Sequence, residues 1–240
     1  MELWEEETYQ YHKRLTSLRE WRPDLSHLIK RLPDIPLDYT PSIQGVVGVN
    51  LSLYVLGCMA FTNQATVAFL KLWGDGLFAT ISLPARLIYE LWGATHFAWQ
   101  TLVQMQDSGD VARALARTQR LTLGARSEVQ LPWVGTTSEK AVHVMDLIRS
   151  LADLNPQADD DYAFLCESCH PSYLRLTSWS LSGPILGNWA NEKFRQQAHS
   201  LIDRTLGVAE RALEGIATEV TRTLELALPY VEADKSHGGT

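Results

Sequence analysis

The chain has 240 residues, of which 45% are hydrophobic, so it can bury the core of one large domain. Its formal net charge of -7 at pH 7 argues against a general nucleic-acid binder, because such a surface repels phosphate. The chain has only three cysteines, and their spacing is not that of a disulfide-rich domain. This argues against a secreted protein that is held together by disulfides. The acidic start, Met1 to Glu7, lacks the basic and apolar regions of an export signal. We therefore expect a cytoplasmic protein.

The N-terminal part predicts two helices and a linker. A first helix is expected from Leu3 to Trp21, and Pro23 starts a short second one, because proline suits a first helical turn but not the interior. Further prolines then force a linker, at Pro33, Pro36 and Pro41. Residues 1–41 are therefore expected to pack, as helices and linker, on a bundle formed by residues 42–230.

The stretch from Ser42 to Leu70 contains no charged residue. Its first part, Ile43 to Phe61, is apolar enough to be considered as a membrane span. Polar side chains interrupt this part and no Lys or Arg cluster stands at either end. A buried core helix from Ser42 to Thr62 is therefore favoured over a stable membrane span. A further helix is expected from Asn63 to Trp73, closed by Gly74 and the residues after it.

The rest of the chain reads as successive helices with almost no strand alternation. The expected elements are a helix from Leu77 to Gln106 bent at Pro84, an Arg-rich helix ending near Arg126, an irregular segment through Thr137, a helix from Ser138 to Leu154, a helix beginning at Asp159, Asp160 and Asp161, a loop from Trp179 to Trp189, and a last helix from Ala190 to Leu228. The three aspartates favour a helix N-terminus, so capping is preferred over metal binding. Residues 231–240 are expected to be a disordered tail. The pattern predicts an all-α, multi-helix bundle in a single domain.

Arg86 and Glu90 are four residues apart on the long helix, so their side chains share one face. Their neighbours on that helix are mostly apolar. If the pair points into the core, each charge needs a partner, because an unpaired buried ion costs several kcal/mol. A third polar group should then lie nearby. The alternative is an ordinary surface ion pair worth a few tenths of a kcal/mol.

Three stretches between residues 60 and 180 carry a resemblance to a known family. They are Leu70-Lys71-Leu72-Trp73-Gly74-Asp75-Gly76, then Leu83-Pro84-Ala85-Arg86-Leu87-Ile88-Tyr89-Glu90, and finally Tyr162, Leu165, Cys166, His170, Pro171 and Ser172. Together they resemble an uncharacterised bacterial family of HEPN-like helical proteins. In that family an Arg-x-x-x-Glu helix is followed by a Tyr-x-x-Leu-Ser-x-x-x-His-Pro-like motif. Cys166 therefore stands here where the family usually has serine.

The resemblance implies a HEPN-like bundle in which Arg86, Glu90, Tyr162 and His170 converge. Such a cluster can serve catalytic proton transfer, since histidine titrates near neutrality and glutamate is a natural partner, or it can be only a structural lock, which we favour. The function implied is that of a defence- or stress-associated protein acting on or with RNA. The alternative is a non-catalytic protein-interaction or oligomerisation module with a structural Arg-Glu-His cluster. A homo-oligomer is expected.

Two further patterns bear on nucleic acid. Arg113, Arg117 and Arg120 are spaced to place three guanidiniums on one helix face, with Arg126 beyond them, and such a row can track phosphates. A solvated face is the more ordinary explanation, because no aromatic side chain interleaves to stack on bases. The stretch from Arg22 to His27 matches the Arg-x4-6-His motif of HEPN ribonucleases, but proline interrupts any helix between the two residues.

Cys166, Cys169 and His170 spell the C-x-x-C-H signature of covalent haem attachment. Such attachment normally takes place outside the cytoplasm, so a c-type haem protein is a remote alternative. A zinc site built from the same residues is weaker still, because adjacent Cys169 and His170 rarely point at one ion. We expect neither a cofactor nor a metal.

Overall fold

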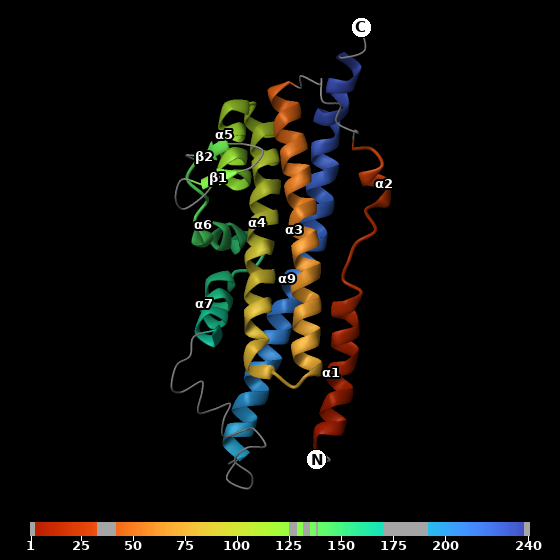
Figure 1. Ribbon diagram of the computed structural model, residues 1–240, viewed down its shortest axis with the longest axis vertical. Coiled ribbons are helices and arrows are strands. Elements are labelled where there is room, and N and C mark those ends of the chain that lie inside the picture. Colours follow the sequence, from red (N-terminus) through yellow and green to blue (C-terminus); the bar gives the residue numbers. More distant parts are fainter. Residues whose placement is uncertain are drawn as a thin grey trace. The chain divides into compact units, whose positions relative to one another are not determined.

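The computed structural model of the chain describes residues 3–32, 42–124, 129–131, 135–137, 139–169 and 192–237 (Figure 1). Regular structure in these residues is helical apart from one short pair of strands, which confirms the all-α, multi-helix class. Some predicted features lie outside the described residues: the linker with Pro33, Pro36 and Pro41, then Arg126, Ser138 and His170, and the loop from Trp179 to Trp189.

The chain divides into two compact units, and the long helices α3 (Ile43–Gly74), α4 (Ser82–Ser108) and α9 (Glu192–His237) contribute to both. Unit 1 consists of Met1–Trp21, Phe61–Glu90 and Ala152–Gly215, and it also holds α1 (Leu3–Arg19), the 3-10 helix η1 (Phe78–Thr80) and α7 (Ala158–Cys169). Unit 2 consists of Arg22–Ala60, Leu91–Leu151 and Ile216–Thr240, and it also holds α2 (Ser26–Ile29), α5 (Val111–Thr122), β1 (Val129–Leu131), β2 (Gly135–Thr137) and α6 (Val144–Arg149). A second 3-10 helix, η2 (Ser150–Asp153), follows α6.

An aromatic cluster, buried at Phe69 and half-buried elsewhere, lies where α1, α3 and η1 meet in unit 1. Trp73 packs edge-on against Tyr11 of α1 and against Phe78 of η1, with ring centroids 5.2 Å apart in both pairs. Phe69, one turn earlier on α3, stacks on Trp73 at 6.3 Å. Aromatic pairs of this kind contribute about 0.5–1.5 kcal/mol each beyond the area they bury. Immediately after this anchor, Gly76 adopts the left-handed conformation with φ 71° that reverses the chain.

The core of unit 2 depends on close backbone approach at two glycines. A Cβ at Gly48 of α3 would lie 3.2 Å from Val231 Cγ2 and 3.3 Å from the carbonyl oxygen of Ala227, both on α9. A Cβ at Gly93 of α4 would lie only 2.7 Å from the carbonyl oxygen of Leu147 on α6. That distance is shorter than van der Waals contact, so α4 and α6 pack backbone against backbone at Gly93.

Helix α3 is one element, whereas the sequence predicts a break between Thr62 and Asn63. It runs unbroken from Ile43 to Gly74. Neither proline nor glycine stands at the expected junction, and the Thr66 hydroxyl donates to the Thr62 carbonyl oxygen at 2.8 Å within the helix. Thr62 and Asn63 therefore lie within one continuous helix.

The starts of α4 and α6 also differ from expectation. Pro84 lies in the first turn of α4 rather than at an internal bend, because the helix begins at Ser82 and a first-turn proline has no helical N–H bond to lose. The helix predicted from Ser138 begins at Val144 instead. His143 is its N-cap, and the imidazole accepts a hydrogen bond from the next-but-one backbone N–H at 3.2 Å.

The last helix is longer than the sequence predicts. Helix α9 passes through Pro229 and continues to His237, so residues 231–237 are helical where a disordered tail was expected from residue 231. Val231 is buried, which shows that the extension packs in unit 2. In addition, the segment predicted to be irregular contains an antiparallel strand pair in which Val129 lies opposite Thr137.

Helix α3 is buried on one face only. Val47, Leu51 and Val55 are fully buried at four-residue spacing, whereas Leu53 and Phe61 are exposed. By length and composition α3 is apolar enough to cross a membrane, and 44% of its apolar window is buried inside the structure. The buried face is that of a core helix, as the sequence favours, but the opposite face leaves apolar side chains uncovered.

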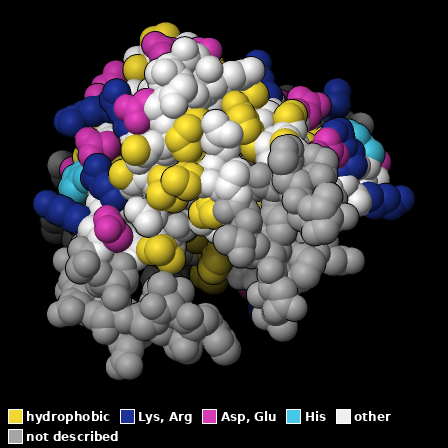
Figure 2. Space-filling model, turned by 90° about the horizontal axis from the view of Figure 1, so that it is seen from above, with side chains coloured by type: hydrophobic (Ala, Val, Ile, Leu, Met, Phe, Trp, Pro, Cys, Tyr) yellow, Lys and Arg dark blue, Asp and Glu magenta, His cyan; other side chains and the backbone are white. Residues whose placement is uncertain are grey.

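Exposed apolar side chains are a feature of this surface. On the face drawn in Figure 2, hydrophobic side chains gather near the middle and charged side chains lie toward both sides. Among the described residues, the large exposed hydrophobic side chains are Ile29, Ile43, Leu53, Phe61, Val67, Leu77, Leu83, Leu87 and Leu154. Apolar surface of this kind is typical where protein molecules contact one another. The expected homo-oligomer stays a prediction.

Candidate functional site

Three of the four residues that the resemblance brings together meet in unit 1. Arg86 Nε donates to Glu90 Oε1 at 2.9 Å along α4. Arg86 Nη2 donates to the Tyr162 hydroxyl oxygen on α7 at 3.0 Å, and the Tyr162 hydroxyl donates to the same Glu90 oxygen at 2.7 Å. The three side chains form a closed ring of hydrogen bonds, here called the Arg-Glu-Tyr cluster, that ties α4 to α7. His170, the fourth predicted member, lies outside the described residues.

The Arg-Glu-Tyr cluster is partly open to solvent. The side chains of Arg86 and Glu90 are 36% and 28% exposed, whereas Tyr162 is 4% exposed. Burial and the hydrogen bond to Glu90 raise the pKa of Tyr162 above its ordinary value. Burial opposes the charge on Arg86, but the hydrogen bonds with Glu90 and Tyr162 prevail and raise its pKa. The cluster is thus neither the dry core lock nor the free surface pair that the sequence analysis considered.

A second polar network lies beside Tyr162 and includes Asp161, the residue before it on α7. The rings of Tyr89 and Tyr162 stack at 6.5 Å. Asn155 Nδ2 lies 2.9 Å from the Tyr89 hydroxyl oxygen and 3.0 Å from Asp161 Oδ2, and donates to both. Burial raises the pKa of Tyr89, with the Asp161 carboxylate as the next cause. The hydroxyl of Tyr89 therefore stays protonated between these partners.

Asp161 points into unit 1 rather than capping α7. The residue is 3% exposed, and its Oδ2 accepts from Arg211 Nη2 on α9 at 2.9 Å. Arg204 Nη2, also on α9, lies 3.9 Å from Oδ1. The capping role expected for all three aspartates thus does not describe Asp161, which is a buried carboxylate held by two arginines from a distant helix.

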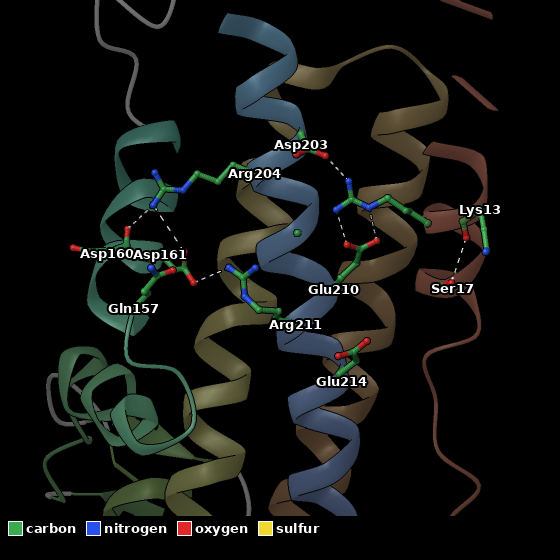
Figure 3. Close-up of a pocket in the computed structure, with 12 residues that line it drawn as sticks. Lys13, Ser17, Gln157, Asp160, Asp161, Asp203, Arg204, Glu210, Arg211 and Glu214 are labelled. Atoms are coloured by element: carbon green, nitrogen blue, oxygen red, sulfur yellow. Dashed lines mark hydrogen bonds and ion pairs between the residues drawn. The ribbon is translucent and has the colours of Figure 1, made fainter. Parts of the chain in front are cut away.

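A cleft of about 1050 Å³ opens in unit 1 beside these ion pairs (Figure 3). Its walls come from α1, α7 and α9. It is lined by Lys13, Arg14, Ser17, Gln157, Asp160, Asp161, Asp203, Arg204, Gly207, Glu210, Arg211 and Glu214. Four of these residues are cationic and five are anionic. Most of the residues that line the cleft are therefore charged, and both signs are present on its walls.

Arg14 joins α1 to α9 across the cleft. Its Nε and Nη2 donate to the two carboxylate oxygens of Glu210 at 2.8 and 2.6 Å, and its Nη1 donates to Asp203 Oδ1 at 2.5 Å. Bidentate arginine–carboxylate pairs are among the stronger ion pairs because both partners are planar and held in a fixed geometry. The hydrogen bond with Glu210 is the main cause that raises the pKa of Arg14.

The cleft is not predicted by the sequence, although α9 carries a signal for it. Asp203, Gly207, Glu210 and Glu214 are four, three and four residues apart, so they lie on one face of the helix. Charged residues along one face of a helix are equally consistent with a solvated face, so this pattern alone does not predict a cleft. What turns the charged stripe into a cleft wall is the presence of α1 and α7 on either side.

The predicted row of arginines on α5 is broken in unit 2. Arg117 turns inward, where its guanidinium lies 4.0 Å from the ring centre of Phe97 and its Nε donates to the Thr101 hydroxyl oxygen at 3.1 Å. Burial lowers the pKa of Arg117, helped by the neighbouring arginines. Arg120 Nε donates to the backbone carbonyl of Lys140 at 3.2 Å. Arg113 is exposed, and Arg126 lies outside the described residues.

The remaining candidate motifs show no assembled site. Cys166 and Cys169 lie near the end of α7 as free cysteines, and burial raises the pKa of the Cys169 thiol. Arg22 and His27 are both exposed, and α2 includes only the second of them. Among the described residues, no group of three or more His, Cys, Asp or Glu side chains is arranged to hold a metal ion.

Comparisons of the chain with protein-family models, with curated proteins and with solved structures found no match. By its fold and site, the chain is an all-α protein that carries a charged cleft in one of two compact units.

Proposed function

We propose that the protein is a HEPN-like, non-catalytic binding module whose charged cleft in unit 1 receives a polar ligand or a charged segment of a partner protein. The observation that carries this proposal is the cleft itself, about 1050 Å³ in volume and lined from three helices by charged groups of both signs. This volume lies at the upper end of the range found for ligand sites in proteins. The resemblance implies that Arg86, Glu90 and Tyr162 converge. Their contact in unit 1 supports the proposal that the protein is HEPN-like.

The geometry of the Arg-Glu-Tyr cluster favours a structural role over catalysis. A general base needs a carboxylate lone pair directed at a substrate proton. One of the two carboxylate oxygens of Glu90, Oε1, is occupied by hydrogen bonds from Arg86 Nε and the Tyr162 hydroxyl. The cluster residues do not line the cleft. The cluster therefore holds α7 on α4, and through Asp161 it helps to fix one wall of the cleft.

An RNA-directed role in defence or stress gains less support from the geometry. Arg117 is turned away from the face that would meet phosphates, and five carboxylates line the cleft. Phosphate backbones are held by unpaired Lys and Arg side chains, not by a surface of mixed sign. An RNA-directed role would be supported if the wild-type protein were toxic in cells and the His170→Ala variant were not.

Charge reversal within the cleft tests the proposed function. We expect ligand-observed NMR with a panel of small charged compounds and short charged peptides to detect binding to the wild type. The double variant Lys13→Glu, Asp160→Lys reverses two exposed lining charges, so binding should weaken about tenfold or more. Arg113→Glu, which changes an exposed arginine that does not line the cleft, is the matched control. Equal binding by all three proteins would refute the cleft as the binding surface.

Tyr162→Phe tests the structural role of the Arg-Glu-Tyr cluster. We expect the free energy of unfolding to fall by about 1–2 kcal/mol, because Arg86 and Glu90 each lose a hydrogen-bond partner. The raised pKa of Tyr162 adds stability that is fully present below its ordinary value of 10.0 and is lost as pH rises through the folded-state value. The variant should therefore lose less stability than the wild type above pH 10.

Urea denaturation at neutral pH and above pH 10 measures both effects. Tyr230→Phe removes a hydroxyl from a partly exposed tyrosine of unit 2 and serves as the control, with little change expected. If the two variants behave alike at both pH values, the cluster does not hold α4 to α7.

A further inference from the structure

Helix α3 carries a line of side chains, here called the α3 stripe, that the described residues leave uncovered. Counting forward from Ile43 in alternating steps of three and four residues, every position as far as Val67 is exposed or half-buried. Such spacing keeps one line of contact along a helix, as in the seam between two packed helices. Because α3 is one unbroken helix, the relation between these positions follows from helix geometry alone.

The face of α3 that carries the stripe is apolar and has no charge. Asp, Glu, Lys and Arg are absent from residues 42–70. Leu53 and Phe61, the largest side chains exposed in the middle of this face, are 54% and 60% exposed. A charged partner would gain no ion pair here and would lose its hydration. The surface that complements this face is therefore uncharged too.

Gly57 stands in the middle of α3, where glycine is a poorer helix former than alanine. The fold does not require glycine there, because an added Cβ would meet nothing within 4 Å. At Gly48 of the same helix, by contrast, a Cβ would lie 3.3 Å from the carbonyl oxygen of Ala227. The bare backbone at Gly57 therefore has no packing role inside its own chain, and it permits another helix to approach closely.

The chemistry of this face is mirrored about Gly57. Leu53 and Phe61, both large and apolar, are four residues before and after it. Asn50 and Gln64, the two carboxamides of the α3 stripe, are seven residues before and after it. Two copies of α3 that cross antiparallel at Gly57 place leucine on phenylalanine and asparagine beside glutamine, twice over. This is the self-complementary pairing that a two-fold axis requires.

A second copy suits the two carboxamides better than lipid does. Each carboxamide has N–H donors and an acceptor oxygen, so Asn50 and Gln64 can pair with one another across the axis. In the hydrocarbon of a membrane the same groups would lose their hydrogen bonds with water. An unrelated protein partner would not require the mirrored arrangement. A second copy of the chain therefore accounts for both the polar and the apolar positions.

We propose that the protein forms a two-fold symmetric dimer in which the α3 stripes of two copies pack antiparallel and cross at Gly57. This dimer goes beyond the proposed function, because none of the residues that line the charged cleft lies on α3. It assigns the homo-oligomer that the sequence predicts to one surface.

Sedimentation equilibrium measures the dimer and its dissociation constant. Leu53→Glu should weaken the dimer about tenfold or more, because the introduced carboxylate would be buried against Phe61 of a second copy. Phe61→Lys should weaken it for the same reason. Leu154→Glu makes the same change at an exposed leucine outside α3, and it should leave the dissociation constant unchanged. Far-UV circular dichroism of these variants should match the wild type, since each replaced side chain is exposed.

The double variant Leu53→Glu, Phe61→Lys tests the antiparallel crossing. In the proposed dimer each introduced carboxylate meets the introduced ammonium of the other copy. The double variant should therefore dimerise about tenfold more tightly than either single variant. In a parallel dimer like charges would face each other, and the double variant would be weaker than both.

Three results would overturn the proposal. The first is a wild type that sediments as a monomer at every concentration tested, and flotation of that monomer with phosphatidylcholine vesicles would assign the face to lipid instead. The second is a Leu53→Glu variant that dimerises like the wild type, which would place the interface elsewhere. The third is a double variant weaker than both single variants, which would exclude the antiparallel crossing at Gly57.

Discussion

Replacing Arg211 with methionine is expected to lower the free energy of unfolding by about 2–3 kcal/mol. The reason is an asymmetry of burial, because the side chain of Asp161 is 4% exposed while that of Arg211 is 48% exposed. Removing the arginine strands a carboxylate that cannot return to water, and breaking a buried pair in this way typically costs about 3–5 kcal/mol. Arg204 at 3.9 Å and Asn155 at 3.0 Å remain as partners, so we expect the smaller loss.

The reverse replacement should cost less. Asp161→Asn leaves Arg211 free to be hydrated, and we expect a loss of about 1 kcal/mol. The double variant should be no less stable than Arg211→Met alone, since no carboxylate is stranded. Arg113→Met, at an exposed arginine of unit 2, is the control for loss of a surface charge. Equilibrium denaturation of all four variants would contradict the asymmetry if Arg211→Met were as stable as this control.

Replacing both His96 and Glu219 with leucine is expected to raise the stability by about 1–4 kcal/mol. The two side chains are 2% and 1% exposed in unit 2, and His96 Nδ1 lies 3.6 Å from Glu219 Oε2. Among the described residues neither of these two atoms has a hydrogen-bond partner. The attraction between the two groups does not fully offset the cost of removing them from water. Replacement of buried ionic groups by apolar side chains has been neutral or stabilising by about 1–4 kcal/mol.

We expect the stability of each single variant to differ from that of the double variant, and the two single variants to differ from each other. His96→Leu alone leaves the buried carboxylate of Glu219 with Arg222 Nη1 at 3.4 Å as its closest cation, so it should destabilise. Glu219→Leu alone leaves His96 Nε2 beside Gln100 at 3.0 Å and should cost less. A double-mutant cycle by thermal unfolding measures the coupling. A double variant less stable than the wild type would contradict the expectation, and additive single losses would show that the two side chains are not coupled.

Pattern alone predicts part of the candidate site. The four-residue spacing of Arg86 and Glu90 places them on one face of α4, and the motif resemblance adds Tyr162, with which both form hydrogen bonds. Local rules succeed here because an i,i+4 pair on a helix depends only on helix geometry. The same rules do not reveal how far the cluster is buried, since exposure depends on what the rest of the chain places over it.

Tertiary packing gives different burial and contacts to residues that share the same local sequence pattern. Asp159, Asp160 and Asp161 have the same local sequence signature, yet only Asp161 is buried. Arg113, Arg117 and Arg120 share one predicted face, yet Arg117 packs on Phe97. In each set the buried or packed residue is the one that meets a partner from another helix, and spacing along one helix carries no information about that partner.

The sequence by itself determined that the chain is all-α, where most helices lie, and that Arg86 and Glu90 form a pair. Only the tertiary structure decided that α3 is continuous, that Asp161 is a buried ion, and that α1, α7 and α9 enclose a charged cleft. The physical reason is that helix formation and i,i+4 pairing are governed by residues close in sequence. Burial of a charge depends instead on counter-charges, and here Arg211 is 50 residues from Asp161 along the chain.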